Sequence, residues 1–181
     1  MQSCGELSDA LKYYRTPYSN ERKFITQFRL LLEHPRSFHR DHFPGHITAS
    51  CWIMDEHNQF ALLTHHAKLN RWLQPGGHAD GDEDVLAVAW REAQEETGLK
   101  SLRLASDEIF DIDIHPIPAR HDFPQHDHYD IRFLFHASMH EPLTITEESI
   151  DLAWKQVNAL PVLTDHNESI LRMAEKVKKL F

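Results

Sequence analysis

The sequence predicts a mixed α+β fold in which a helical extension, residues 1–44, precedes one larger domain, residues 45–181. Apolar residues recur at helical spacing in the first 45 residues. From residue 46, short segments rich in β-branched and aromatic residues alternate with helical ones. No internal repeat or low-complexity linker interrupts the sequence, and 181 residues suffice to bury one core.

We expect two helices in the extension, neither of which carries a chemical motif. The first covers roughly residues 6–14. The second lies in SNERKFITQFRLLLEHP, with Ser19 as its expected N-cap and Pro35 just beyond its end. Its expected apolar side consists of Phe24, Phe28, Leu31 and Leu32. Packing or dimerisation is the role we expect for these helices.

The next segments predict strands. HITASCWIMD and QFALLTHH are short and β-rich, and DEHN between them predicts a hairpin. EIFDIDIHP and HYDIRFLFHA alternate polar and apolar residues, which predicts two further strands. The Pro- and His-rich segment IPARHDFPQHDH between them is expected to form a loop.

The sequence also predicts a C-terminal helix in TDHNESILRMAEKVKKLF, capped by Asp165 and Glu168. Its expected apolar side consists of Ile170, Met173, Ala174, Val177 and Phe181.

A further helix lies in the middle of the chain, in DGDEDVLAVAWREAQEETGLK. Asp82 is its expected N-cap, and Gly98 can supply the left-handed residue that ends it. One expected side is mostly apolar: Leu86, Ala89, Trp90, Ala93 and Thr97. At 100° per residue, the adjoining arc carries Glu92, Glu95 and Glu96.

Three carboxylates on one arc repel one another, so a positive charge is expected near them. Like charges four residues apart destabilise a helix by roughly 0.2–0.5 kcal/mol. Arg91 can pair with Glu95, but one arginine cannot neutralise three carboxylates. Magnesium prefers oxygen ligands and bridges carboxylates to substrate phosphates, so the arc is a candidate metal site. Taken alone, REAQEE is more typical of a solvated helix face.

The composition limits the partners of such a site. The sequence has 19 Lys and Arg residues against 28 Asp and Glu residues, a formal charge of −9 that opposes nonspecific binding to nucleic acid or an anionic membrane. Cys4 and Cys51 are too few for a disulfide framework. The sequence has no signal-peptide pattern and no apolar run of membrane-spanning length. We therefore expect a cytoplasmic protein that handles phosphates through metal cations.

Residues 77–99 resemble the signature of the Nudix hydrolases: Gly, five residues, Glu, seven residues, then Arg-Glu-apolar-any-Glu-Glu-any-Gly-apolar. The matching residues are Gly77, Glu83, Arg91, Glu92, Ala93, Glu95, Glu96, Gly98 and Leu99. The resemblance implies an α/β/α sandwich around a mixed sheet. It also implies an enzyme that uses Mg²⁺ or Mn²⁺ to hydrolyse a nucleoside diphosphate linked to another moiety.

The same resemblance implies roles for the signature residues. Glu92, Glu95 and Glu96 would bind the metal with the Gly77 carbonyl, while Arg91 and Glu83 would orient the ligands. The general base stays open: it is a signature glutamate, with Glu92 and Glu95 as the candidates, or one of the loop residues Glu147 and Glu148.

The expected substrate contacts come from the alternating strands. Asp111, Asp113 and His115 share one face of the first, and His126, His128, Asp130 and Arg132 share one face of the second. Either this polar face lines a cavity, with Arg132 suited to a phosphate, or it meets water. The substrate-binding candidates are Arg132, His128, Asp130, His115 and Trp72. Trp72 lies just before the glycines at which the signature begins.

Several questions stay open at the level of sequence. A transition-metal site is one open question. Its candidate ligands are His78, His115, His126 and His128, but their spacing does not define a site. The cues of known Nudix subgroups are missing, so an NDP-sugar, an ADP-ribose-like compound and a nucleoside triphosphate all remain as substrates. Alternatives are a non-catalytic nucleotide-sensing module and an RNA 5′-end pyrophosphohydrolase, the latter disfavoured by the charge. A homodimer is plausible.

Overall fold

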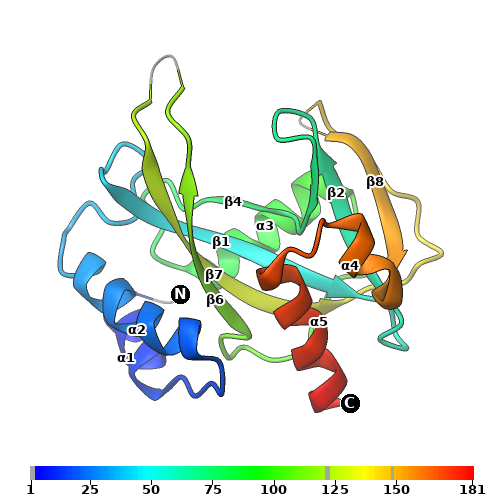
Figure 1. Ribbon diagram of the computed structural model, residues 1–181, viewed down its shortest axis with the longest axis horizontal. Helices are drawn as coiled ribbons and strands as arrows, with labels where there is room; N and C mark the ends of the chain where they lie inside the picture. Colours follow the sequence, from blue (N-terminus) through cyan, green and yellow to red (C-terminus); the bar gives the residue numbers. More distant parts are fainter. Residues whose placement is uncertain (1–2, 121–122, 148) are drawn as a thin grey trace. The chain divides into compact units, whose positions relative to one another are not determined.

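The computed structural model describes residues 3–120, 123–147 and 149–181 (Figure 1). Its helices are α1 (Cys4–Tyr13), α2 (Ser19–Leu31), α3 (Val85–Thr97), α4 (Leu160–Leu163) and α5 (Glu168–Leu180), with a 3-10 turn η1 (Val157–Ala159). Its strands are β1 (Gly45–Met54), β2 (Phe60–His66), β3 (Arg71–Leu73), β4 (Gly76–His78), β5 (Arg103–Leu104), β6 (Asp111–Ile117), β7 (His126–His136) and β8 (Ser149–Gln156). The α+β fold class expected from the sequence is confirmed.

Hydrogen bonds join the strands in the order β3-β2-β1-β7-β5, while β4 pairs with β1, β6 with β7 and β8 with β2. The β1–β2, β2–β3, β2–β8, β5–β7 and β6–β7 pairs are antiparallel. None of the helices in the described ranges is long and apolar enough to cross a membrane.

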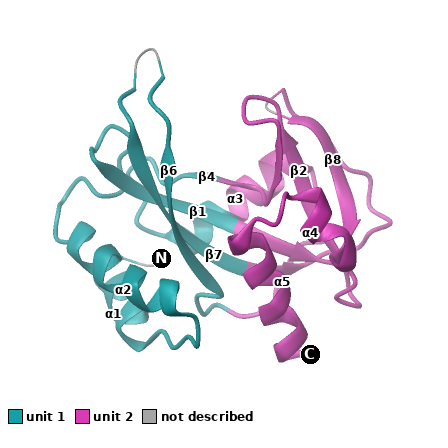
Figure 2. Cartoon of the chain, viewed as in Figure 1, with its two compact units in different colours: residues 1–50, 77–89, 107–133 teal, residues 51–76, 90–106, 134–181 magenta. Residues whose placement is uncertain are grey.

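The chain divides into two compact units (Figure 2). The first unit comprises residues 1–50, 77–89 and 107–133, and the second comprises residues 51–76, 90–106 and 134–181. The elements β1, β4, α3 and β7 contribute residues to both units. The helical extension therefore shares a unit with β6, and the division of the chain at residue 44 stays a prediction.

In the first unit, the extension is anchored through buried side chains. Leu7, Leu11 and Phe28 are almost completely buried. Glu21 of α2 is also buried, and its Oε1 accepts hydrogen bonds from the Tyr14 hydroxyl at 2.7 Å and from the Ile112 backbone N–H of β6 at 3.2 Å. A buried carboxylate is costly unless it is hydrogen-bonded, so these contacts fix α2 against β6.

The helix caps of the extension differ from the sequence expectation. Ser3 and Glu6 form a capping box, so α1 begins earlier than expected. Ser19 is the first residue of α2, not its N-cap; Tyr18 holds that position without a side-chain hydrogen bond. The Thr16 hydroxyl, just before the helix, donates to the buried carboxylate of Glu21 within it.

In the second unit, the predicted hairpin is confirmed. Ile53 pairs with Leu62, and Met54 pairs with Ala61. The Asp55 carboxylate accepts backbone hydrogen bonds from His57, Gln59 and Phe60, which closes the turn. β2 also pairs with β8 along its whole length.

The C-terminal helix is also confirmed, with two corrections. Asn167, rather than Asp165 or Glu168, caps α5, because its Oδ1 accepts from the Ser169 and Ile170 backbone N–H groups. Phe181 lies beyond the last turn and is 73% exposed, so it does not complete the apolar side. The other members of that side are buried: Ile170, Met173, Ala174 and Val177.

Candidate active site

The signature helix α3 begins and ends at well-defined backbone features. Its N-terminal cap is Asp84, because Asp84 Oδ1 accepts from the Ala87 backbone N–H at 3.1 Å; the expected cap, Asp82, instead accepts from the Asp84 backbone N–H. Gly98 has a φ of +73°. A Cβ at Gly98 would lie 2.5 Å from Thr144 Oγ1, so both the conformation and the space require glycine there.

The structure confirms most of the expected apolar side of α3. Ala89, Ala93 and Thr97 are buried, whereas Leu86 and Trp90 are half-buried. Two further residues outside the expected side, Val85 and Val88, are also buried.

The three signature glutamates differ in exposure. The Glu92 side chain is 17% exposed and accepts from Arg91 Nη2 at 3.0 Å. The Glu95 side chain is 64% exposed, and its Oε1 lies 4.0 Å from Arg91 Nε. Glu96 is half-buried, and its Oε1 accepts from the Gly76 backbone N–H at 3.4 Å. Arg91 therefore contacts the carboxylates of Glu92 and Glu95.

These side chains fit a hard divalent cation. Glu92, Glu95, Glu96 and Arg91 together carry three negative formal charges and one positive charge. Water reaches all three carboxylates to some extent, so a cation can replace it, and their oxygen atoms are the ligands that magnesium and manganese prefer. The Arg91–Glu92 hydrogen bond fixes one carboxylate, as hydrogen bonds around metal ligands commonly do.

The remaining signature positions lie at defined places. Gly77 is the central residue of β4, and β4 pairs with β1. Glu83 is exposed and accepts from the Cys4 backbone N–H at 2.8 Å, which ties it to the start of α1. Of the two loop candidates for the base, Glu147 is exposed, and Glu148 lies outside the described residues.

Trp72 already has partners on its ring. The His65 ring stacks on it with centroids 4.9 Å apart and planes 14° apart. Lys155 Nζ lies 3.8 Å from the Trp72 ring centroid. A nucleobase that stacks on Trp72 would have to displace one of these two contacts.

Arg132 holds the centre of a buried ionic network in the first unit. It is 2% exposed, and its guanidinium pairs with Asp111 at 3.2 Å, Asp113 at 3.3 Å and Asp130 at 2.7 Å. Burial alone favours the neutral form, but the aspartates outweigh it and hold the pKa of Arg132 above its usual value. Asp130 also accepts from Thr48 and Ser50 hydroxyls.

This network bears on the substrate contacts expected from the polar face of β6 and β7. Asp111, Asp113 and Asp130 surround the Arg132 guanidinium in the interior, whereas the His115 side chain on the same face is 38% exposed. The Asp130 carboxylate accepts hydrogen bonds from Thr48, Ser50 and Arg132. The phosphate contact expected from Arg132 stays a prediction, because a phosphate would have to compete with these three carboxylates for the buried guanidinium.

The two histidines expected to bind the substrate lie opposite each other on paired strands, where His115 of β6 faces His128 of β7. His115 Nδ1 lies 3.3 Å from Asp113 Oδ2. His128 instead joins His46 and His78 in a cluster of imidazoles. The sequence patterns did not indicate His46; its place as the second residue of β1, directly after Gly45, is the signal that could have suggested it.

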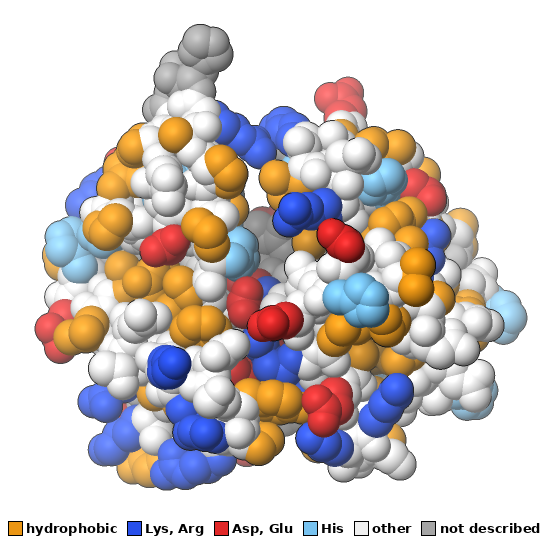
Figure 3. Space-filling model, viewed as in Figure 1, with side chains coloured by type: hydrophobic (Ala, Val, Ile, Leu, Met, Phe, Trp, Pro, Cys, Tyr) orange, Lys and Arg blue, Asp and Glu red, His pale blue; other side chains and the backbone are white. Residues whose placement is uncertain are grey.

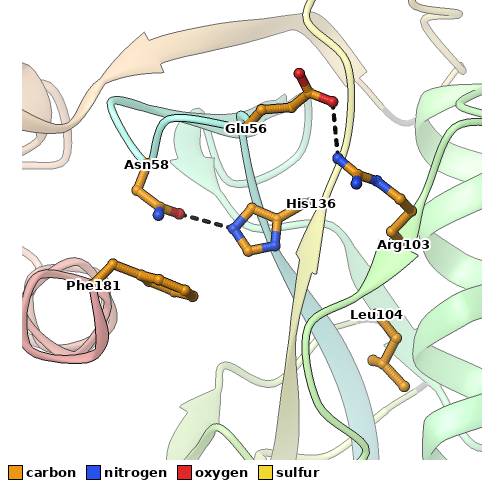
Figure 4. A pocket seen from close by; sticks show the side chains of 6 residues that line it. All are labelled: Glu56, Asn58, Arg103, Leu104, His136 and Phe181. Atoms are coloured by element: carbon orange, nitrogen blue, oxygen red, sulfur yellow. Dashed lines mark hydrogen bonds and ion pairs between the residues drawn. The ribbon is translucent and has the colours of Figure 1, made fainter.

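A separate hollow in the second unit contains none of the signature residues (Figure 4). His136 Nε2 donates to Asn58 Oδ1 at 2.9 Å, and Arg103 pairs with Glu56 at 2.9 Å. Leu104 and Phe181 complete its lining.

The surface of the extension is more basic than the net charge suggests. Figure 3 shows Lys and Arg side chains gathered over the segment that carries α1 and α2. The exposed cationic residues there are Lys12, Arg15, Arg22, Lys23 and Arg29. The chain as a whole keeps a formal charge of −9, so this basicity is local.

Solved structures share this fold at low sequence identity. An Ap4A hydrolase from C. elegans in a binary complex is 20% identical, with a TM-score of 0.59, covering 75% of this chain and 98% of its own. A MutT protein from Methanosarcina mazei Go1 is 18% identical (TM-score 0.55; 75% and 94%). The dihydroneopterin triphosphate pyrophosphohydrolase of E. coli is 15% identical (TM-score 0.56; 71% and 92%).

Sequence comparison identifies the family directly. Among curated proteins none matched the chain. The model of the NUDIX domain, however, matches residues 44–177, which is well over half of the chain and includes the whole signature. The chain therefore belongs to the Nudix hydrolases, a family that acts on pyrophosphate bonds.

Proposed function

We propose that this protein is a divalent-metal-dependent pyrophosphohydrolase that cleaves a phosphoanhydride in a nucleoside diphosphate linked to another moiety. The observation that carries the proposal is the complete carboxylate set of α3: Glu92, Glu95 and Glu96 follow Arg91, which contacts two of them. A module that only sensed nucleotides would not require all of these groups.

The proposed chemistry assigns a task to each residue. Magnesium or manganese, when bound, supplies positive charge that stabilises the transition state of phosphoanhydride hydrolysis. Glu92, Glu95 and Glu96, with the Gly77 carbonyl, would hold the metal, and Arg91 would keep Glu92 in place. Glu83, held by the Cys4 backbone, would steady the loop that precedes α3.

The general base in this proposal is Glu95. Its side chain is 64% exposed, against 17% for Glu92, so water can reach it and its proton can leave to solvent. Glu92 is less suited, because it is largely buried and bonds Arg91. Glu147 and Glu148 remain the competing candidates in the loop.

The substrate class rests on weaker support. Two of the structures with the same fold are named for Ap4A and for dihydroneopterin triphosphate, and both of these compounds contain phosphoanhydrides. Candidate contacts in this chain are His115, half-exposed on β6, and Trp72 if its ring partners move aside.

A panel assay tests the proposal. The chain is incubated with NDP-sugars, ADP-ribose, dinucleoside polyphosphates and nucleoside triphosphates, with magnesium, with manganese or with chelator, and every product is resolved. We expect cleavage at a phosphoanhydride that chelator abolishes. Tight metal-dependent binding without cleavage of any compound would favour the sensing module instead.

The basic surface of α1 and α2 keeps the RNA alternative in the test. RNA with a 5′-triphosphate end joins the panel, and its binding is measured across a salt series. Cleavage of the RNA end, with binding that weakens steeply as salt rises and in the variant Arg22→Gln, would support an RNA 5′-end pyrophosphohydrolase over the small-molecule enzyme.

A further inference from the structure

The first unit contains a group of histidines that the proposed hydrolysis does not use. One ligand nitrogen from each of His46, His78 and His128 lies within 4.8 Å of the others. The three ring centroids are 5.0–5.2 Å apart. The residues come from β1, β4 and β7, so three strands of the sheet, rather than loops, hold the rings.

The distances suit one metal ion with little movement. A tetrahedral zinc ion with Zn–N bonds of about 2.0–2.1 Å separates its nitrogen ligands by roughly 3.3 Å. The nitrogens of the cluster need to close by about 1.5 Å at most to reach that separation. Rotation about the two side-chain torsions of a histidine covers this distance without a change in the strands.

Two buried ring nitrogens point to a missing partner. Among the described residues, His46 Nε2 and His128 Nε2 are buried and have no hydrogen-bond partner. A buried polar atom without a partner costs about 1–3 kcal/mol, so native proteins rarely keep two of them side by side. One metal ion would satisfy both nitrogens at once.

The tautomer of His46 prepares it for this role. Its Nδ1 lies 3.3 Å from the His42 carbonyl oxygen, which can only accept, so Nδ1 carries the proton. The lone pair is therefore on Nε2, the nitrogen that is buried without a partner. Metal-binding histidines commonly hold their second nitrogen against a carbonyl in this way.

The surroundings keep the rings neutral. Burial lowers the pKa of His46 to about 4 and that of His128 to about 2. The positive charge of Arg40, which Asp80 holds through a two-point ion pair, also lowers the pKa of His46. Neutral imidazoles are the form that binds metals.

The neighbouring histidines lie differently. His126 stacks on His46 with the ring planes 28° apart and a centroid distance of 5.0 Å, so it presents a ring face rather than a lone pair. Its Nδ1 lies 2.8 Å from the Pro124 carbonyl oxygen. His115 bonds Asp113. Both therefore lie outside the set of ligands.

We infer that His46, His78 and His128 form a site for one zinc ion, with water at the fourth position. Imidazole is a preferred ligand of zinc and a poor one for magnesium, so this site is distinct in donor chemistry from the carboxylates of α3. Because His78 follows Gly77 directly in β4, the ion would also fix the backbone beside that signature residue.

Metal titration of the full chain tests the inference without reference to hydrolysis. The chain is stripped with chelator and titrated with zinc in excess magnesium, with calorimetry and elemental analysis as readouts. Cobalt then replaces zinc, and its visible absorption reports tetrahedral nitrogen coordination. We expect one zinc per chain and an intense cobalt band; no zinc bound under these conditions overturns the inference.

Matched variants assign the ligands. His46→Gln, His128→Gln and the less buried His78→Gln should each weaken zinc binding by about 100-fold or more. His57→Gln, in the β1–β2 turn, and His126→Gln, beside the cluster, should retain it. Circular dichroism checks the fold of each variant. Zinc binding that persists in all three cluster variants, or that fails only in His126→Gln, overturns the assignment.

Discussion

The buried guanidinium of Arg132 is stable only because three carboxylates surround it. Replacing Arg132 by Met would leave Asp111, Asp113 and Asp130 as uncompensated buried charges. We expect Arg132→Met to lower the free energy of unfolding by about 3–5 kcal/mol, measured by urea denaturation.

The matched control is Arg103→Met in the second unit. Arg103 forms a single exposed ion pair with Glu56, so we expect a change below about 1 kcal/mol. Equal effects of the two substitutions would contradict the distinction between a buried network and a surface pair.

His136 provides a test of local electrostatics. Burial first, and then the positive charge of Arg103, lower the pKa of its imidazole from the usual value of about 6.5. Because the folded pKa is below the unfolded one, the stabilisation is present above the unfolded pKa and is lost as the pH falls through the folded pKa.

An NMR titration of the His136 ring measures this directly. We expect a midpoint below that of a model peptide and an upward shift in Arg103→Gln, since the opposing charge is removed. A midpoint for His136 at or above that of the model peptide would be inconsistent with the burial of its ring.

Helix α3 depends on the left-handed residue at its end. Gly98→Ala would combine a φ of +73° with a clash against Thr144, so we expect a loss of at least about 1 kcal/mol in thermal or urea unfolding. Gly5→Ala provides a control of opposite sign. Gly5 lies within α1, where an added Cβ has space, so the change should stabilise by about 0.5–1 kcal/mol. A Gly98→Ala chain as stable as Gly5→Ala would refute the role of the cap.

The sequence predicted the elements better than their ends. The periodicity of α2, α3 and α5 and the alternation of β6 and β7 were strong enough to locate them, because each element buries one face. Caps were less certain: Asp84 and Asn167 replaced Asp82 and Asp165, since several neighbouring residues can accept the same backbone hydrogen bonds.

The site residues also differ in how far the sequence could predict them. A local helical motif placed Glu92, Glu95 and Glu96 on one arc. The surroundings of the other site residues depend on long-range strand pairing. The guanidinium of Arg132 is suited to a phosphate, but the strand register places Asp111 opposite it. The clustering of His46 with His78 and His128 joins residues up to 82 positions apart, which no local pattern encodes.

At the scale of the whole molecule, the helical extension is part of the folded structure rather than an appendage. Phe28 of α2 is fully buried and packs edge-on against Tyr129 of β7, with centroids 5.2 Å apart. We expect Phe28→Ala to destabilise the chain by about 3–5 kcal/mol. Leu30→Ala, at a position 61% exposed on the same helix, should change stability by less than about 0.5 kcal/mol.

Urea unfolding followed by two probes checks this claim. Tryptophan fluorescence and far-ultraviolet circular dichroism should report one shared transition that moves to lower urea in Phe28→Ala. An extension that melts separately, leaving the remaining transition unmoved, would show that α1 and α2 are dispensable for the fold.

The central claim is that the carboxylates of α3 perform metal-dependent hydrolysis. The most direct measurement is the turnover, with saturating magnesium, of Glu92→Gln, Glu95→Gln and Glu96→Gln on the best compound of the panel, beside Glu175→Gln. Glu175 is the matched control, because it pairs with Lys179 on α5 just as Glu95 faces Arg91. We expect each signature variant to fold normally and to lose roughly 100-fold or more in turnover, with the control unchanged. Near-normal turnover in the signature variants would contradict the account.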